Sequence, residues 1–212
     1  MKRYLAECIG TFFLALAVNF TGDALAIGLM FMAMVYIFGP ISGCHLNPAI
    51  SLSMFVHRRI SLATMAFYMV AQVIGACLFF ALAFFIFGSV IPARIIPAEA
   101  FNGAASFELL LTMVLCSVIL VVTSCNKFKD SHVNGLVIGL TFTALATFPG
   151  LYNPALALGS MISNFIGGQG AMPGLKEAGV YLILPLLAGA AAALKYNYFY
   201  SEHPDNHGAH QQ

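Results

Sequence analysis

The tripeptide Asn-Pro-Ala occurs twice in this sequence, as Asn47-Pro48-Ala49 and as Asn153-Pro154-Ala155. Asn is a favoured N-cap of an α-helix and Pro is a favoured first helical residue, so each copy predicts the start of a helix. A helix N-terminus carries a partial positive charge of about half an electron, and each Asn amide can donate hydrogen bonds. Two such N-termini that face each other would oppose cations while the amides bind a neutral molecule.

The chain that carries these motifs is too apolar for a soluble protein. Of its 212 residues, 60% are hydrophobic and 8% are charged, with a formal net charge of +1. This composition excludes a soluble enzyme, and the near-neutral charge argues against a nucleic-acid partner. We therefore expect the lipid bilayer to be the surroundings of the chain.

Apolar runs, separated by Gly, Pro and charged residues, predict six membrane-spanning helices, because a bilayer core takes about 20 apolar residues per helix. The expected spans are Tyr4–Val18, Ala24–Phe38, Ser61–Phe87, Phe107–Thr123, Val133–Phe148 and Glu177–Tyr198. The sequence thus predicts an all-α membrane protein with one transmembrane domain over residues 1–200.

Lys and Arg residues are distributed unequally between the two sides of these spans. Two of them, Arg94 and Lys176, fall on one side, and seven fall on the other: Lys2, Arg3, Arg58, Arg59, Lys127, Lys129 and Lys195. The excess predicts a multi-pass protein of the cell membrane with both termini in the cytoplasm. The polar tail 201–212, which contains three histidines, is expected to be disordered.

Two apolar segments remain, and both are too short to cross a bilayer. They are Ile41–Val56, after Gly39-Pro40, and Leu151–Ile166, after Pro149-Gly150, and each contains one Asn-Pro-Ala copy. Backbone that leaves a helix at membrane depth must be buried in protein or line a wet cavity, because lipid cannot satisfy its polar groups. Two re-entrant half-helices therefore imply a water-filled path.

An internal repeat relates the two halves of the chain, approximately 1–90 and 104–200. Each half has three predicted spans, with its motif after the second, so the halves are inverted relative to each other. Glu7 and Glu108 occupy the first span of each half. A carboxylate inside a membrane is costly unless it is paired, so both residues are predicted to support a loop or to relay protons.

The sequence resembles the aquaporin family, also called major intrinsic proteins, over nearly its whole length. The stretches that carry the resemblance are Ala6–Phe13, Ile41–Ala49 and Gly150–Gly159. The resemblance implies a six-helix pore in each subunit, homotetramers, and passive conduction of water or small neutral solutes without a cofactor. It also implies that Glu7 and Glu108 accept hydrogen bonds from the re-entrant loops, which favours loop support over a proton relay.

One departure from the family concerns the outer constriction. Water-selective members resemble one another in an arginine directly after the second Asn-Pro-Ala, where this chain has Leu156. The other constriction positions, matched by spacing, are Ile27, Ala146 and Gly150. This apolar set offers no arginine or histidine, and the Asp that marks glycerol-type members is also missing. The identity of the permeant therefore does not follow from the resemblance.

His45, two residues before Asn47, either lines the inner mouth of the pore or bonds a loop carbonyl. It does not form a catalytic dyad with the adjacent Cys44, because a nucleophile and a base also need an orienting group. The five cysteines show no metal-ligand spacing. The sequence predicts a permissive passive channel for water, glycerol or urea; the alternative is a structural or closed membrane protein of the same fold.

Overall fold

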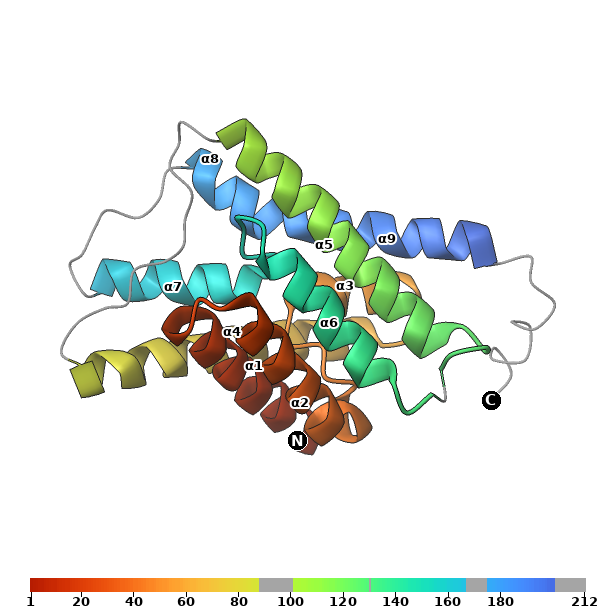
Figure 1. Ribbon diagram of the computed structural model, residues 1–212, viewed down its shortest axis with the longest axis horizontal. Helices are drawn as coiled ribbons and strands as arrows, with labels where there is room; N and C mark the ends of the chain where they lie inside the picture. The colour runs from red at the N-terminus through yellow and green to blue at the C-terminus, as the bar shows by residue number, and fades with distance from the viewer. Residues whose placement is uncertain (88–100, 130, 167–174, 201–212) are drawn as a thin grey trace.

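The computed structural model describes residues 1–87, 101–129, 131–166 and 175–200, which form helices joined by short loops (Figure 1). The helices are α1 (Lys2–Phe20), α2 (Ala24–Ser42), α3 (Pro48–Val56), α4 (Leu62–Phe87), α5 (Phe101–Ser124), α6 (Asn134–Ala146), α7 (Pro154–Ile166), α8 (Leu175–Ala178) and α9 (Leu184–Tyr200), with a π-helical segment η2 (Gly179–Ile183) between the last two. The tail 201–212, for which we expect disorder, lies outside the described residues.

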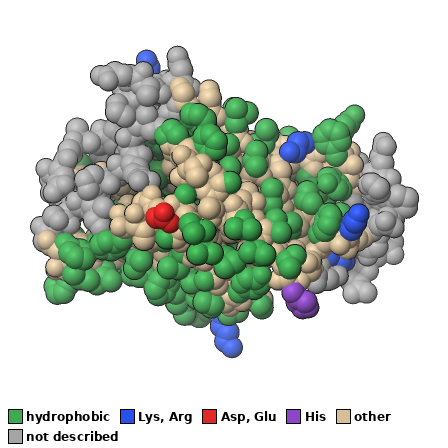
Figure 2. Space-filling model, in the orientation of Figure 1, with side chains coloured by type: hydrophobic (Ala, Val, Ile, Leu, Met, Phe, Trp, Pro, Cys, Tyr) green, Lys and Arg blue, Asp and Glu red, His purple; other side chains and the backbone are tan. Residues whose placement is uncertain are grey.

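Five of the described helices are long and apolar enough to cross a membrane. They are α1, α2, α4, the Ala105–Ser124 part of α5, and the continuous segment Gly179–Tyr200. The sixth expected span, α6, is apolar but has 13 residues, which rise only about 20 Å at 1.5 Å per residue. Hydrophobic side chains cover much of the face in Figure 2, while Lys and Arg lie mainly toward its edges. The chain is thus an all-helical, multi-pass membrane protein.

Helix packing joins the two halves of the chain. Within the bundle α1 packs against α4, α2 against α6, and α5 against α9. The half-helix of each half packs against the last long helix of the other half, so α3 contacts α9 and α7 contacts α4. Gly189 of α9 permits one of these contacts, because a Cβ atom there would collide with the carbonyl oxygen of Ala49. The two half-helices therefore lie inside the bundle.

The end of α2 differs from the prediction. The sequence predicts an end at Phe38, before Gly39-Pro40, but α2 continues through Pro40 to Ser42. Gly43 then ends the helix with a φ of 86° and donates its N–H to the carbonyl of Gly39 at 2.9 Å. Tertiary contacts hold this last turn, since the Ser42 carbonyl accepts a 2.7 Å hydrogen bond from the hydroxyl of Tyr68.

Candidate functional site

Both half-helices begin at a buried asparagine. Asn47 precedes α3, and its Oδ1 accepts the backbone N–H of Ala49 at 2.9 Å. Asn153 precedes α7, and its Oδ1 accepts the N–H of Ala155 at 3.0 Å. The two asparagines are only 2% and 1% exposed. The positive ends of two helix dipoles thus lie in the protein interior.

The side-chain amides of the two asparagines connect the two loops. Nδ2 of Asn47 donates to the carbonyl oxygen of Tyr152 at 2.7 Å, and Nδ2 of Asn153 donates to that of Leu46 at 2.8 Å. An amide nitrogen carries two hydrogens, and these bonds use one from each. Among the described residues the second hydrogens have no partner. Two donors at one junction are therefore available to another molecule.

The residues that supply these carbonyls have an unusual backbone. Leu46 has a φ of 51° and Tyr152 a φ of 53°, both in the left-handed region that such side chains rarely adopt. A backbone of this kind costs roughly 1–3 kcal/mol per residue and persists only where surrounding contacts hold it. The contacts come from two buried carboxylates, one in each half of the chain.

Glu7 of α1 is fully buried and accepts four hydrogen bonds. Its Oε1 accepts the hydroxyl of Ser42 at 2.6 Å and the backbone N–H of His45 at 2.9 Å. Its Oε2 accepts the N–H of Leu46 at 2.7 Å and the side-chain amide of Gln72 at 2.8 Å. Hydrogen bonds of this kind to an ionised group are about twice as strong as neutral ones, and here they fix the first loop.

Glu108 of α5 is also fully buried and contacts the second loop in the same way. Its two oxygens accept the backbone N–H groups of Leu151 and Tyr152, at 2.5 and 2.9 Å. Position 185, which the repeat pairs with Gln72, is occupied by Pro185 and has no amide to offer. Among the described residues, each carboxylate thus accepts two backbone N–H groups from its loop, and Glu7 accepts two further bonds, from Ser42 and Gln72.

His45 belongs to the hydrogen-bond network behind the first loop. Its Nδ1 lies 3.1 Å from the Ser51 hydroxyl, which also accepts a 3.0 Å bond from the amide of Gln72. A hydroxyl both donates and accepts, so the Ser51 oxygen can accept from Gln72 and pair with Nδ1 of His45 in either tautomer of the ring. The ring meets that of Tyr68 edge-on, with 5.1 Å between centroids. Its side chain is held by protein contacts and is only 5% exposed.

The four constriction positions from the sequence come from four different segments. Ile27 lies in the first turn of α2, Ala146 ends α6, Gly150 lies in the loop before α7, and Leu156 lies in the first turn of α7. Ile27 and Leu156 are buried in one hydrophobic cluster, and Ala146 packs against it. Gly150 is half-buried. Their side chains therefore offer only apolar surface.

Tyr152 is the residue that the sequence reasoning missed. Its side chain is 1% exposed, and its hydroxyl has no hydrogen-bond partner among the described residues. The ring lies where a side chain at position 150 would project, because a Cβ on Gly150 would lie 2.5 Å from ring atoms and 2.7 Å from the hydroxyl oxygen. The sequence signal that could have pointed to Tyr152 is its position, directly before Asn153 and two residues after Gly150. Tyr152 therefore adds a polar atom beside an apolar constriction position.

Residues 1–196 match the sequence profile of the family described as major intrinsic protein. The chain belongs to the major intrinsic protein family. It is 37% identical to glycerol uptake facilitator protein-like 6 of Lactiplantibacillus plantarum, with 91% of this chain and 95% of that protein covered. It is 28% identical to aquaporin Z of Rhodopseudomonas palustris, with 92% of each covered.

A solved structure supports the same assignment for this major intrinsic protein. The aquaglyceroporin from Plasmodium falciparum superposes with a TM-score of 0.75 at 26% identity, and 92% of this chain and 95% of that chain are covered. The prediction of an aquaporin-like helical membrane fold is confirmed. Members of this family are channels and not enzymes.

Proposed function

We propose that this protein is a passive channel for water and small uncharged solutes, with Asn47 and Asn153 at its centre. The observation that carries the proposal is the reciprocal bonding of the two asparagine amides, which leaves one donor hydrogen on each. Relatives named as a glycerol uptake facilitator and an aquaporin support this class of permeant.

The free amide hydrogens would hold one permeant oxygen between them. A water molecule that accepts both has no lone pair left for a proton from its neighbour in the file. The half-helices α3 and α7 each direct a partial positive charge of about half an electron to this point, which opposes cations. Water and neutral solutes would pass while protons and other cations are excluded.

The apolar constriction supports weak discrimination among neutral solutes. Selectivity needs either a bore too narrow for a competitor or polar groups that fit only one permeant. Ile27, Ala146, Gly150 and Leu156 provide no polar side chain, and the polar atom that lies beside Gly150 is the hydroxyl of Tyr152. Glycerol and urea are therefore proposed as permeants beside water.

A closed channel or structural protein of the same fold is the second candidate. The observation that favours it is the burial of Ile27 and Leu156, which are 2% and 1% exposed and so have almost no surface in contact with water. An apolar constriction of this kind can exclude water by dewetting. Conduction measurements separate the two candidates, because a closed protein leaves permeability at the lipid baseline.

The remaining parts of the proposal concern loops and assembly. Glu7 and Glu108 are proposed as supports of the two loops, on the basis of the bonds that their carboxylates accept. His45 is proposed to lie by the inner mouth. We also propose inverted repeats over 1–90 and 104–200, a location in the cell membrane with both termini in the cytoplasm, and a homotetramer. The sequence pattern and the family resemblance support these proposals.

Stopped-flow light scattering of proteoliposomes tests the proposal. An impermeant osmolyte should shrink native vesicles faster than protein-free ones, and glycerol or urea should shrink and then reswell them. Asn47→Asp, reconstituted at equal protein content, is the test variant, because the central donor is replaced by an acceptor, and Asn19→Asp is its matched control. Native vesicles that shrink at the protein-free rate would support the closed alternative.

A further inference from the structure

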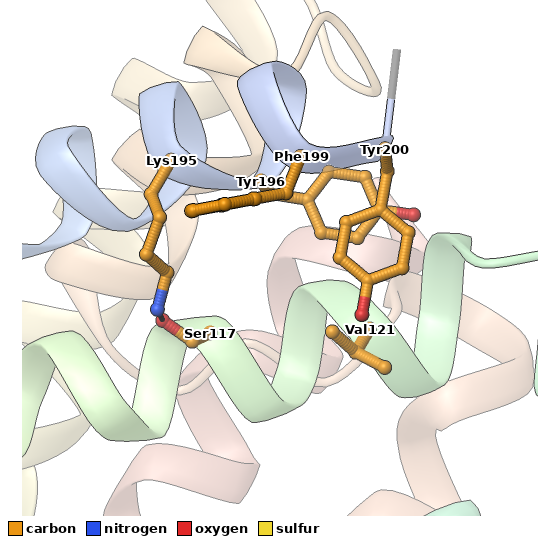
Figure 3. A pocket seen from close by; sticks show the side chains of 6 residues that line it. All are labelled: Ser117, Val121, Lys195, Tyr196, Phe199 and Tyr200. Atoms are coloured by element: carbon orange, nitrogen blue, oxygen red, sulfur yellow. Dashed lines mark hydrogen bonds between the residues drawn. The ribbon is translucent and has the colours of Figure 1, made fainter. Parts of the chain in front are cut away.

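A pocket of about 470 Å³ lies between α5 and the last turns of α9. Figure 3 shows Lys195 and Tyr200 at opposite sides of this pocket and α5 beneath them. The lining consists of Ser117 and Val121 from α5 and Lys195, Tyr196, Phe199 and Tyr200 from α9. Its volume falls in the range of roughly 300–1,000 Å³ that is typical of small-molecule sites.

Lys195 places a cation in this pocket at the edge of the membrane. Its exposed side chain donates to the hydroxyl of Ser117 at 2.7 Å, which uses one of its three ammonium hydrogens. α9 ends five residues later at Tyr200, about 7.5 Å away along the helix axis. A cation at that depth is costly unless an anion or polar groups compensate it.

The aromatic residues around Lys195 are typical of a membrane interface. Tyr196 and Tyr200 stack with 4.5 Å between ring centroids and 9° between ring planes. Phe199 is 66% exposed, so its ring is available to lipid chains. The ammonium of Lys195 can attract a phosphate, and the exposed ring of Phe199, beside the stacked tyrosines, offers apolar surface to an acyl chain.

Further cations surround the same end of the bundle. Arg59 donates to the carbonyl of Thr123 in the last turn of α5 at 3.1 Å, and Lys127 and Lys129 follow that helix. Clusters of Lys and Arg at a membrane surface attract anionic headgroups, at about 1 kcal/mol per residue. The charge of this end is therefore complementary to an anionic lipid.

A second copy of this chain is a poorer occupant of the pocket. The carboxylates whose side chains the structure describes are Glu7, Asp23 and Glu108. Glu7 and Glu108 are buried and bonded to the loops, and Asp23 caps the start of α2 through the N–H of Ala26. Within the described residues, a neighbouring subunit thus has no free carboxylate to offer Lys195 at this depth.

We propose that this pocket binds an anionic phospholipid, with its phosphate on the ammonium of Lys195. The acyl chains then lie over Phe199 and Val121, and the Ser117 hydroxyl orients the ammonium toward the phosphate. In the proposed orientation the lipid comes from the cytoplasmic leaflet. Binding itself does not depend on conduction, so a failure of one proposal leaves the other standing.

A single tryptophan measures this binding directly, because the native chain contains none. Phe199→Trp puts a reporter in the pocket of the full-length protein, and Phe85→Trp puts one at the exposed far end of α4. Each is reconstituted in phosphatidylcholine vesicles that contain increasing brominated phosphatidylglycerol, or brominated phosphatidylcholine as the reference. Quenching gives the relative binding constant of the two lipids at each tryptophan.

At the Phe199→Trp reporter we expect phosphatidylglycerol to bind about fivefold more tightly than phosphatidylcholine. This ratio corresponds to the attraction of about 1 kcal/mol that one interfacial charge contributes. Adding Lys195→Gln should lower the ratio to about one, while Lys195→Arg should keep it. Lys176→Gln, in α8 at the opposite end of the last helical segment, is the matched control and should also keep the ratio. Three results would overturn the proposal. The first is equal binding of the two lipids at the Phe199→Trp reporter, and the second is the same preference for phosphatidylglycerol at the α4 reporter. The third is a preference for phosphatidylglycerol that survives Lys195→Gln.

Two further outcomes would show that something other than a lipid occupies the pocket. Weak quenching of the pocket reporter by every brominated lipid would mean that protein covers the pocket, and would overturn the lipid assignment in favour of a subunit contact. Quenching that appears only after removal of residues 201–212 would assign the pocket to the tail instead. Native mass spectrometry of the tryptophan-free protein gives a second measurement, in which Lys195→Gln should lose one bound phosphatidylglycerol that Lys176→Gln retains.

Discussion

Asn47 and Asn153 each donate an amide hydrogen to the loop that precedes the other, with Nδ2–oxygen distances of 2.7 and 2.8 Å. The same two side chains also cap the half-helices that follow them. One residue type thus aligns the loops, caps the helices and supplies the free donors. A change at either asparagine should therefore affect both stability and ion exclusion.

Asn47→Asp should lower stability by about 2–3 kcal/mol, because a carboxylate replaces the donor to the Tyr152 carbonyl and leaves that acceptor unpaired. The new negative charge also opposes the positive helix ends, so proton and potassium leak should rise. A pH-sensitive dye inside proteoliposomes measures the leak. Asn19→Asp is the control, since Asn19 donates to the carbonyl of Ala15 on α1 alone. Unchanged leak and water flux in Asn47→Asp would refute the central role of this residue.

The two buried carboxylates should differ in their contribution to folding. Glu7→Gln exchanges one of two accepting oxygens for a donor and disturbs a group with four hydrogen bonds, whereas Glu108→Gln disturbs two. Losing hydrogen bonds to a charged group costs about 1.5–3 kcal/mol each. We expect a lower melting temperature in detergent for both variants, with the larger decrease for Glu7→Gln.

Flux per folded channel distinguishes loop support from a proton relay. Loop support predicts that both glutamine variants give less folded protein but near-normal water flux once the flux is divided by protein content. A variant with normal melting temperature and selectively lost transport would instead assign its carboxylate to a relay.

Loss of the hydroxyl should change the stability of the protein in opposite directions at Tyr152 and at Tyr68. The Tyr152 hydroxyl is buried without a described partner, so Tyr152→Phe should raise stability by about 1 kcal/mol. Tyr68→Phe removes a 2.7 Å bond to the Ser42 carbonyl and should lower stability by a similar amount. Melting temperatures of the two variants, measured side by side in one detergent, test the signs. A decrease for Tyr152→Phe would mean that its hydroxyl has a partner, such as a bound water.

Gly189→Ala should separate the half-helix α3 from α9. The added methyl group would meet the carbonyl oxygen of Ala49, and overpacking of this kind costs about 1–3 kcal/mol. Gly179→Ala on the same continuous helix is the control, because a Cβ there meets nothing within 4 Å. We expect a lower melting temperature for Gly189→Ala alone. Equal melting temperatures for the two variants would contradict the close α3–α9 contact.

The features that the sequence predicted are those set by local chemistry. The helix starts at Asn47 and Asn153 follow from capping by neighbouring residues, and the spans follow from continuous apolar runs. The end of α2 was predicted too early, because the contact that holds Ser42 comes from Tyr68. The carbonyl partners of the asparagines could not be predicted, since they lie 105 and 107 residues away along the chain.

The side chain at position 156 should determine which solutes pass through the channel. Leu156 lies in the first turn of α7 with a 1% exposed apolar side chain. Leu156→Arg adds a long side chain with five donors, which narrows the path and binds water. Leu156→Met is the matched control, because it keeps an apolar side chain of similar volume.

We expect native proteoliposomes to shrink and then reswell in glycerol, because the apolar constriction has nothing that rejects this solute. Leu156→Arg should keep water flux within about threefold of the native value and lose at least about tenfold of glycerol flux, which corresponds to about 1.4 kcal/mol of discrimination. Leu156→Met should behave as the native channel does. Fast native water flux with rejection of both glycerol and urea would mean that a constriction other than the one at Leu156 sets the bore, and the Tyr152 ring beside Gly150 would be the first place to test.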